Sequence, residues 1–273
     1  MYPTAREMTE EHAWSLLLQV ARGEPGEPAL ERSGQGWIPA GGQAPGVQGL
    51  LERYLPFLQD PPGDRPRVLA HMAQSLDGRI ALPCGESQWI SGPEDLDHTH
   101  RLRALSDAVL VGALTVERDD PQLTVRRVPG PSPLRVVLDP RGRLDGTQRV
   151  FTGDTPTLVV SGAPRALPAG TEALQLPCGE GGLEPAVLLA ALQARGIRRV
   201  FIEGGGVTIS RFLAASCVDR LHLVVAPLLV GQGRPSLSVP LGSTLTACPR
   251  PPTRVIPLGA DWLFDCDLSG EVG

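Results

Sequence analysis

The feature that most constrains this chain is an alternation of short apolar segments with helical patterns, which begins at Arg67. Apolar runs bounded by Gly, Pro or Asp are typical of buried strands, whereas spacings of three and four residues are typical of helices. The predicted strands are 68–74, 108–111, 134–138, 157–161, 200–203, 221–226 and 262–268, and the predicted helices are 93–106, 186–195 and 206–215. Only the C-terminal end breaks the alternation, with a second strand at 254–257. We therefore expect an α/β fold with a mostly parallel central sheet flanked by helices and an antiparallel C-terminal edge.

The first 63 residues lack this alternation. A helical pattern covers 1–22, a stretch rich in Gly and Pro follows, and a short amphipathic segment covers 50–58. So few apolar residues do not make an independent core. We expect residues 1–63 to form an N-terminal helical and loop appendage that packs on a main domain of residues 64–273.

The charged residues exclude several function classes. The chain has 25 basic and 30 acidic residues, a net charge of −5, and every basic residue is arginine. A mildly acidic chain has no global field to hold nucleic acid or an anionic membrane. Without lysine there is no Schiff-base lysine and no Walker lysine, so a phosphate must be bound by arginine, hydroxyl or backbone N–H groups.

The five cysteines form no C-x-x-C pair, no signal peptide opens the chain, and no apolar run approaches the ~18 residues of a membrane helix. These features predict reduced thiols and a cytoplasmic protein. No HxE or PCxxC element is present, so no metal site is expected. The sequence LPCGE occurs at 82–86 and again at 176–180, and we attach no function to the repeat.

A glycine turn follows the predicted strand at 200–203. Glu203 precedes Gly204, Gly205 and Gly206, and a helical pattern starts at once. Glycine lets the backbone approach a ligand, and a helix N-terminus offers free N–H groups to a phosphate. The dinucleotide fingerprint is absent, because its third glycine position holds Ile209. A tight strand-to-helix turn without a ligand is the alternative.

Three further segments are ambiguous by themselves. His100 and Arg103 are three residues apart on a predicted helix, so they lie on one face of it. They either contact the same ligand or are exposed to solvent. Asp119 and Asp120 precede an extended segment with Arg126, and they form either an acid–base or ion site or the start of a turn at Pro121. Trp89 lies between polar residues and contacts either a cofactor or other protein residues.

Taken together, the segments resemble a known family. SLDGRIA, GESQWIS, HRLRALSDAVLVG, TVERDDPQLTVR, PLRVVLDPRGRL, EGGGVT and VDRLHLVVAPLLVG occur in the order found in the reductase half of bacterial bifunctional riboflavin-biosynthesis enzymes, a dihydrofolate-reductase-like family. The resemblance spans 68–233. It implies a dihydrofolate-reductase-like sheet, usually in a homodimer. It also implies reduction by NADPH of 5-amino-6-(5-phosphoribosylamino)uracil to its ribitylamino product, by hydride transfer to C1′ of the ring-opened imine.

The resemblance also implies roles for individual residues. The expected substrate-binding residues are Ser87, Arg103, Leu123, Arg126 and Glu203, with the two arginines on the ribose phosphate and Glu203 on pyrimidine N–H groups. The expected cofactor-binding residues are Ala73, Trp89, Thr115, Asp119, Gly205, Gly206, Val207, Thr208, Ile209 and Ser210, with Arg141 or Arg143 on the 2′-phosphate. Asp119 and Glu203 are the expected catalytic residues.

The chain departs from the family pattern in three places. Residues 1–63 hold no deaminase motif, so we expect reduction without deamination. Val207-Thr208 after the glycines and Pro140 after the 134–138 strand differ from the common family residues. The alternatives are therefore a reductase of the related 2,5-diamino-6-ribosylaminopyrimidinone 5′-phosphate, or a non-catalytic NADP-binding relative. A true dihydrofolate reductase is disfavoured, because nothing points to a pterin-glutamate site.

Overall fold

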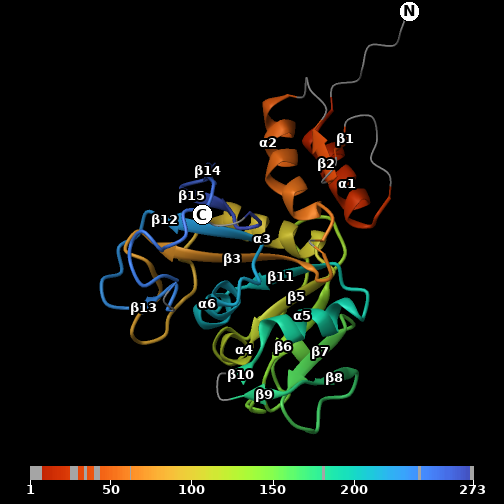
Figure 1. Ribbon diagram of the computed structural model, residues 1–273, viewed down its shortest axis with the longest axis vertical. Coiled ribbons are helices and arrows are strands. Elements are labelled where there is room, and N and C mark those ends of the chain that lie inside the picture. The colour runs from red at the N-terminus through yellow and green to blue at the C-terminus, as the bar shows by residue number, and fades with distance from the viewer. Residues whose placement is uncertain are drawn as a thin grey trace, which may run out of the picture. The chain divides into compact units, whose positions relative to one another are not determined.

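The computed structural model describes residues 8–24, 30–33, 36–39, 44–61, 63–179, 182–238 and 241–270 (Figure 1). Their contacts divide the chain into two compact units, Met1–Pro62 and Gly63–Gly273. No helix in the described ranges is long and apolar enough to cross a membrane.

The first unit contains two helices and a small hairpin. Helix α1 (Glu10–Ala21) begins after Thr9, whose hydroxyl accepts a hydrogen bond from the His12 backbone N–H at 3.2 Å. Strands β1 (Leu30–Ser33) and β2 (Gly36–Pro39) pair antiparallel, and helix α2 (Pro45–Tyr54) continues into the 3-10 helix η1 (Leu55–Leu58). Trp14 of α1 meets Tyr54 of α2 edge-on, with ring centroids 6.0 Å apart. The hairpin was not predicted, and part of the predicted helix at 1–22 lies outside the described residues. That this unit packs on the main domain stays a prediction.

The second unit is built on one nine-stranded sheet with the order β14-β15-β12-β3-β11-β5-β6-β7-β8. Seven strands are parallel: β12 (Arg220–Ala226), β3 (Arg67–Ser75), β11 (Arg199–Glu203), β5 (Ala108–Gly112), β6 (Leu134–Leu138), β7 (Thr157–Ser161) and β8 (Thr171–Gln175). The last two, β15 (Asp261–Asp267) and β14 (Thr253–Leu258), run antiparallel at one edge. The predicted fold class is thus confirmed. Its central strands are buried and apolar, which is why their runs are visible in the sequence.

Helices and short strands complete this unit. The helices are α3 (Pro93–Leu105), α4 (Ala113–Asp119), α5 (Pro185–Gln193), α6 (Gly206–Ala214) and the 3-10 helix η2 (Arg149–Phe151). Strand β4 (Arg79–Ala81) pairs with β13 (Arg234–Pro235), and β9 (Cys178–Gly179) pairs with β10 (Gly182–Leu183). The sequence did not predict these short pairs or β8, because they contain few apolar residues.

One expected helix cap is wrong. Ser91 is a residue type that favours the N-cap position and precedes the predicted helix, but α3 starts at Pro93, as predicted, with Gly92 as its N-cap. Pro93 occupies the first turn, where its missing N–H has no helical partner to lose. The Ser91 hydroxyl instead donates to the Asp95 carboxylate at 2.6 Å. Ser91 therefore orients a carboxylate.

Candidate active site

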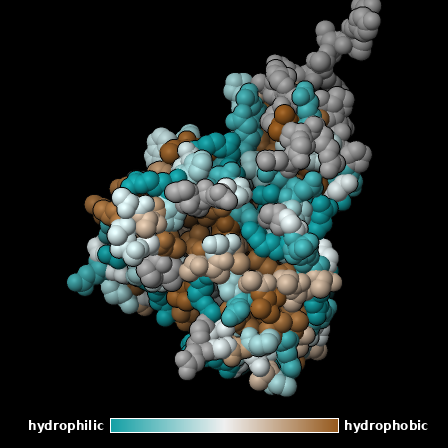
Figure 2. All heavy atoms as spheres, in the orientation of Figure 1, coloured by the Kyte–Doolittle hydropathy of each residue, from teal (hydrophilic) through white to brown (hydrophobic). Residues whose placement is uncertain are grey.

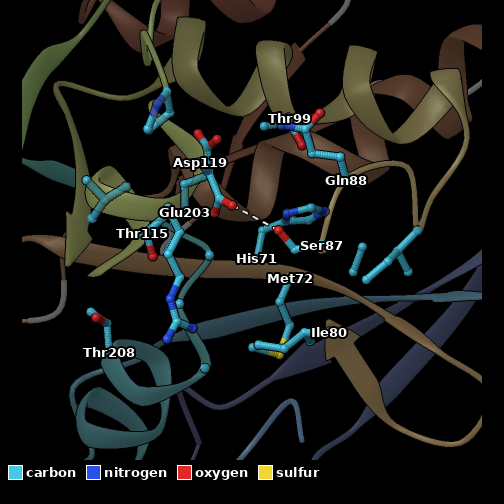
Figure 3. Close-up of a pocket in the computed structure, with 18 of the residues that line it drawn as sticks. His71, Met72, Ile80, Ser87, Gln88, Thr99, Thr115, Asp119, Glu203 and Thr208 are labelled. Carbon is cyan, nitrogen blue, oxygen red and sulfur yellow. Dashed lines mark hydrogen bonds between the residues drawn. The ribbon is translucent and has the colours of Figure 1, made fainter. Parts of the chain in front are cut away.

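A pocket of about 680 Å³ lies at the carboxyl ends of the central strands. Strands β3, β5 and β11 contribute residues to its wall, as do helices α3 and α4, the turn before α6 and the β4–β13 pair (Figure 3). Ligands of open α/β sheets bind at this edge. In Figure 2, apolar residues gather in the middle of the face shown, between hydrophilic margins. The pocket wall itself mixes apolar side chains such as Met72 and Ile80 with charged ones such as Glu203.

The pocket brings together most residues that were predicted from widely separated segments. Its wall includes Ala73, Ser87, Trp89, Arg103, Thr115, Asp119, Leu123, Arg126, Glu203, Gly205, Gly206, Val207 and Thr208. Ile209 and Ser210 do not line it. Ile209 belongs to the hydrophobic core, and the buried Ser210 hydroxyl accepts a hydrogen bond from the Ser238 backbone N–H at 3.0 Å. Both lie on the inner side of α6, so their contacts with a cofactor stay predictions.

The glycine turn between β11 and α6 lines the pocket. Gly204 and Gly205 have positive φ angles of 66° and 72°, a region that favours glycine. A Cβ at Gly206 would collide with the Ser236 carbonyl oxygen, and a Cβ at Gly205 would lie 2.8 Å from the Thr115 hydroxyl. A Cβ at Gly112 would lie 2.7 Å from the Thr208 hydroxyl. Two threonine hydroxyls therefore lie close to these glycines, and the N-terminus of α6 presents free N–H groups beside them, as helix N-termini do.

Glu203 and Arg103 form a bidentate ion pair at the pocket wall. Arg103 Nε donates to Glu203 Oε2 at 2.7 Å, and Nη2 donates to Oε1 at 2.5 Å. Arg103 Nη1 donates to the Thr124 carbonyl oxygen at 2.9 Å. Only 7% of the Arg103 side chain and 19% of the Glu203 side chain are exposed. The pair fixes the position of the Glu203 side chain at the pocket wall and commits much of the Arg103 guanidinium to protein partners.

Arg126, unlike Arg103, has no carboxylate partner among the described residues. It lines the pocket. Burial, followed by the neighbouring Arg103 and Arg149, lowers the pKa of Arg126, which means that an anion would relieve repulsion there. The neighbouring Arg127 is paired with Asp97 at 2.5 Å. Of these arginines, Arg126 is thus the one available to a phosphate.

The backbone around Arg126 is held in place. Its N–H donates to His100 Nδ1 at 3.0 Å. Burial, followed by Arg103 and Arg126, lowers the pKa of His100 to about 4, so the ring is neutral near pH 7. Asp120 and Leu123 have positive φ angles of 40° and 57°, which places this loop in a conformation uncommon for residues other than glycine. Such strain at a pocket wall is typical of functional sites.

Ser87 and Asp119 meet at the other side of the pocket. The Ser87 hydroxyl donates to Asp119 Oδ1 at 2.8 Å (Figure 3). Trp89 also lines this region with 77% of its surface exposed and a φ of 68°. An exposed indole held in an unfavourable backbone conformation is suited to contact a ligand. Asp119 itself is exposed, so it is solvated as well as hydrogen-bonded.

The segment after β6 was expected to meet the adenosine end of the cofactor. The buried Asp139 carboxylate accepts hydrogen bonds from the backbone N–H groups of Arg143 at 2.8 Å and Leu144 at 3.1 Å, and it pairs with Arg165. These contacts fix the turn. The Arg143 side chain pairs with Glu117 at 3.0 Å, whereas Arg141 is exposed and has no ion-pair partner in the described part of the chain. Neither arginine lines the pocket.

The pocket also contains residues that sequence reasoning did not single out as ligands. His71, Ser91 and Thr99 belong to this group. The available signal was a histidine within the predicted strand at 68–74, where residues 68–73 are otherwise apolar, since a titratable residue in a buried strand needs a partner.

Comparison with known proteins identifies the family. Residues 66–248 match the RibD C-terminal domain. The chain is 39% identical over 174 residues to the 2,5-diamino-6-ribosylamino-4(3H)-pyrimidinone 5′-phosphate reductase of Methanothermobacter thermautotrophicus, covering 61% of this chain and 80% of that protein. It is 38% identical over 189 residues to the Archaeoglobus fulgidus protein of the same name, covering 64% of this chain and 86% of that protein.

A solved structure agrees with this result. The diaminohydroxyphosphoribosylaminopyrimidine deaminase/5-amino-6-(5-phosphoribosylamino)uracil reductase of Thermotoga maritima superposes with a TM-score of 0.68 at 30% identity, covering 81% of this chain and 61% of that one. The chain therefore spans less than two thirds of this relative. The resemblance found in the sequence is confirmed. Because the matched region exceeds half of the chain, the protein belongs to the RibD C-terminal domain family, the pyrimidine reductases of riboflavin biosynthesis.

Proposed function

We propose that the protein uses NADPH to reduce the ribosyl group of a 5-phosphoribosylaminopyrimidine to a ribityl group. The observation that carries the proposal is that one pocket combines an anion cradle, a fixed carboxylate and an available arginine. These are the glycine turn before α6, Glu203 and Arg126. They match the three polar parts of the reactants: a diphosphate, a pyrimidine with N–H donors and a ribose phosphate.

The pocket fits a nicotinamide nucleotide. The Gly204–Gly206 turn and the hydroxyls of Thr115 and Thr208 would hold the diphosphate. Trp89 and Ala73 would lie along the rest of the cofactor. When bound, the nicotinamide supplies the hydride, and the protein's contribution is to bind and orient the two reactants.

The substrate we favour is 2,5-diamino-6-ribosylamino-4(3H)-pyrimidinone 5′-phosphate. The two archaeal relatives described above carry that substrate in their names, at higher identity than the Thermotoga protein named for the uracil. Chemistry supports the same choice. An ionised Glu203 only accepts hydrogen bonds, and a 2-amino group beside a ring N–H offers it adjacent donors. The uracil has a carbonyl in place of that amino group.

NADPH oxidation with each of the two pyrimidines tests the proposal. We expect kcat/KM to differ between the two compounds and to be larger for the 2,5-diamino compound. A preference for the uracil would reject our choice of substrate and keep the reductase. No turnover with either compound would reject the reductase function. The homodimer implied by the family resemblance also stays a proposal, and sedimentation of the same sample would test it.

Cofactor preference should depend on Arg141. Since Arg143 is paired with Glu117 and Arg141 is not paired with a described acid, Arg141 is the better candidate for the 2′-phosphate. We expect Arg141→Ala to reduce the NADPH-to-NADH ratio of kcat/KM about 10-fold, the lower end of a charge-assisted contact of about 1.5–3 kcal/mol because the site is exposed. Arg143→Ala is the matched control and should change the ratio less than about 3-fold. Equal ratios in all three proteins would mean that the 2′-phosphate binds elsewhere.

A further inference from the structure

Three polar side chains lie side by side on neighbouring strands, and two of them, His71 and Glu203, line the pocket. Glu203 of β11 is in register with His71 of β3, and His71 is in register with His222 of β12. Residues in register project from the same face of a sheet. Helix α3 supplies a partner for each of them. Asp95 contacts His71, His98 contacts His222 at 3.0 Å, and Arg103 contacts Glu203.

His71 is held by a buried carboxylate. Its Nε2 lies 2.8 Å from Asp95 Oδ1, and the other carboxylate oxygen accepts the Ser91 hydroxyl at 2.6 Å. Asp95 is 2% exposed, and a carboxylate buried so deeply requires a positive partner. Burial alone would lower the pKa of His71, but the charge of Asp95 and the hydrogen bond to it outweigh burial and raise this pKa. The pairing therefore favours an imidazolium beside a carboxylate.

The second ring nitrogen of His71 is available to a ligand. His71 is 5% exposed and belongs to the pocket wall, where Figure 3 labels it near Ser87. Nδ1 has no hydrogen-bond partner within the described ranges. An imidazolium carries a proton on both nitrogens, so Nε2–H is used by Asp95 and Nδ1–H remains as a donor.

Three other groups of the pocket wall, Glu203, Asp119 and His100, already have protein partners. Glu203 accepts two hydrogen bonds from Arg103, so both of its carboxylate oxygens already have a partner. Asp119 is exposed and accepts from Ser87. His100 is neutral near pH 7, because its pKa is lowered to about 4, and its Nδ1 is already occupied by the Arg126 N–H.

We propose that His71 is the general acid of the reduction, with Asp95 as its positioning residue. The proposal rests on the proposed reductase function. As C1′ of the imine accepts the hydride, the carbon–nitrogen π bond breaks and its electron pair moves to the nitrogen. That nitrogen takes the Nδ1 proton of His71 to form the secondary amine. The product imidazole is neutral, keeps its Nε2–H on Asp95 and regains a proton from solvent.

Several charged or titratable groups face His71. They are Asp95, His98 and Arg103 from α3, Glu203 from β11 and His222 from β12. Asp95 and Glu203 favour the imidazolium, while Arg103 opposes it. Asp95 is the only one of them whose hydrogen bond to His71 is shown within the described residues, so Asp95→Asn is the most direct way to change the titration.

The first test reads the protonation of His71 without turnover. The protein is labelled with ¹³C at histidine Cε1 and titrated by NMR, and the His71 signal is assigned by its loss in His71→Gln. We expect His71 to remain protonated above the ordinary histidine pKa of about 6.5, and Asp95→Asn to bring its titration below that value. Titration at or below pH 6.5 in the wild type would overturn the proposal.

The second test measures single-turnover reduction against pH with the 2,5-diamino compound and with the uracil. A general acid contributes about 10²–10⁴-fold. We therefore expect His71→Gln to slow the step at least about 100-fold at pH 7, to change KM less than about 3-fold and to abolish the fall in rate at high pH. Asp95→Asn should retain that fall but move it to lower pH. His98→Gln is the control, because its ring lies 5.6 Å from that of His71 outside the pocket wall, and it should retain both rate and profile.

The outcomes separate the two proposals. If the wild type reduces a pyrimidine and His71→Gln keeps its rate and pH profile, His71 is not the acid and the reductase function stands. If the wild type reduces neither pyrimidine, the function is wrong and this role falls with it. If circular dichroism shows that His71→Gln is unfolded, Asp95→Asn decides: an unshifted pH profile overturns the role, and a shifted one supports it.

Discussion

Glu203→Gln is expected to lower kcat/KM for the pyrimidine by about 5- to 150-fold while leaving NADPH affinity within a few-fold. The amide offers one acceptor and one mismatched donor to the pyrimidine N–H groups, and a buried mismatch costs about 1–3 kcal/mol. The diphosphate cradle uses backbone and hydroxyl groups, so the cofactor should be little affected. Steady-state kinetics and a fluorescence titration with NADPH provide the two measurements. Parallel loss of cofactor affinity and activity would show that Glu203 only braces the glycine turn.

The same substitution should also destabilise the protein, because Glu203 is paired with Arg103. Removing one partner of a buried ion pair costs about 3–5 kcal/mol, and the lower end applies here because 19% of the Glu203 side chain is exposed. Arg103→Gln should cause a similar loss in the free energy of unfolding, and the double variant should lose little more than either single one. Losses that simply add in urea unfolding would show that the two side chains act independently.

Arg126→Gln is expected to reduce kcat/KM for the phosphorylated substrate by about 10- to 150-fold. A charge-assisted contact to a phosphate contributes about 1.5–3 kcal/mol, and Arg126 has no described carboxylate partner that competes for it. The chain provides a matched control in the next residue. Arg127 is already paired with Asp97 and about 39% exposed, so Arg127→Gln should change kcat/KM less than about 3-fold.

The dephosphorylated pyrimidine completes this experiment. Since the lost contact is to the phosphate, Arg126→Gln and the wild type should use the dephosphorylated compound with nearly equal kcat/KM. An equal loss with both compounds would assign Arg126 to another part of the substrate or to the fold. A large loss of kcat/KM in Arg127→Gln with the phosphorylated compound would show that Arg127, and not Arg126, binds the phosphate.

The pattern along the chain was enough to predict the sheet. β6 and β7 have the predicted bounds, and β3, β5, β11, β12 and β15 lie within a residue or so of theirs. A buried strand excludes polar side chains all along its length, so its limits are visible in local composition. The glycine turn was equally visible, because positive φ at Gly204 and Gly205 restricts the residue type at those positions.

Ionic and hydrogen-bonded partners were not predictable in this way. Arg103 and Arg126 were given one role, yet the fold pairs Arg103 with a carboxylate 100 residues away and leaves Arg126 unpaired with any described acid. Similarly, His71 acquires Asp95 as its partner only when α3 packs on β3. The sequence by itself determined the order of strands and helices and the glycine cradle, since these depend on the residues next to each other. The tertiary structure decided which charges are neutralised and which remain available to a ligand, because that depends on strand register and helix placement, which bring distant side chains within hydrogen-bond distance.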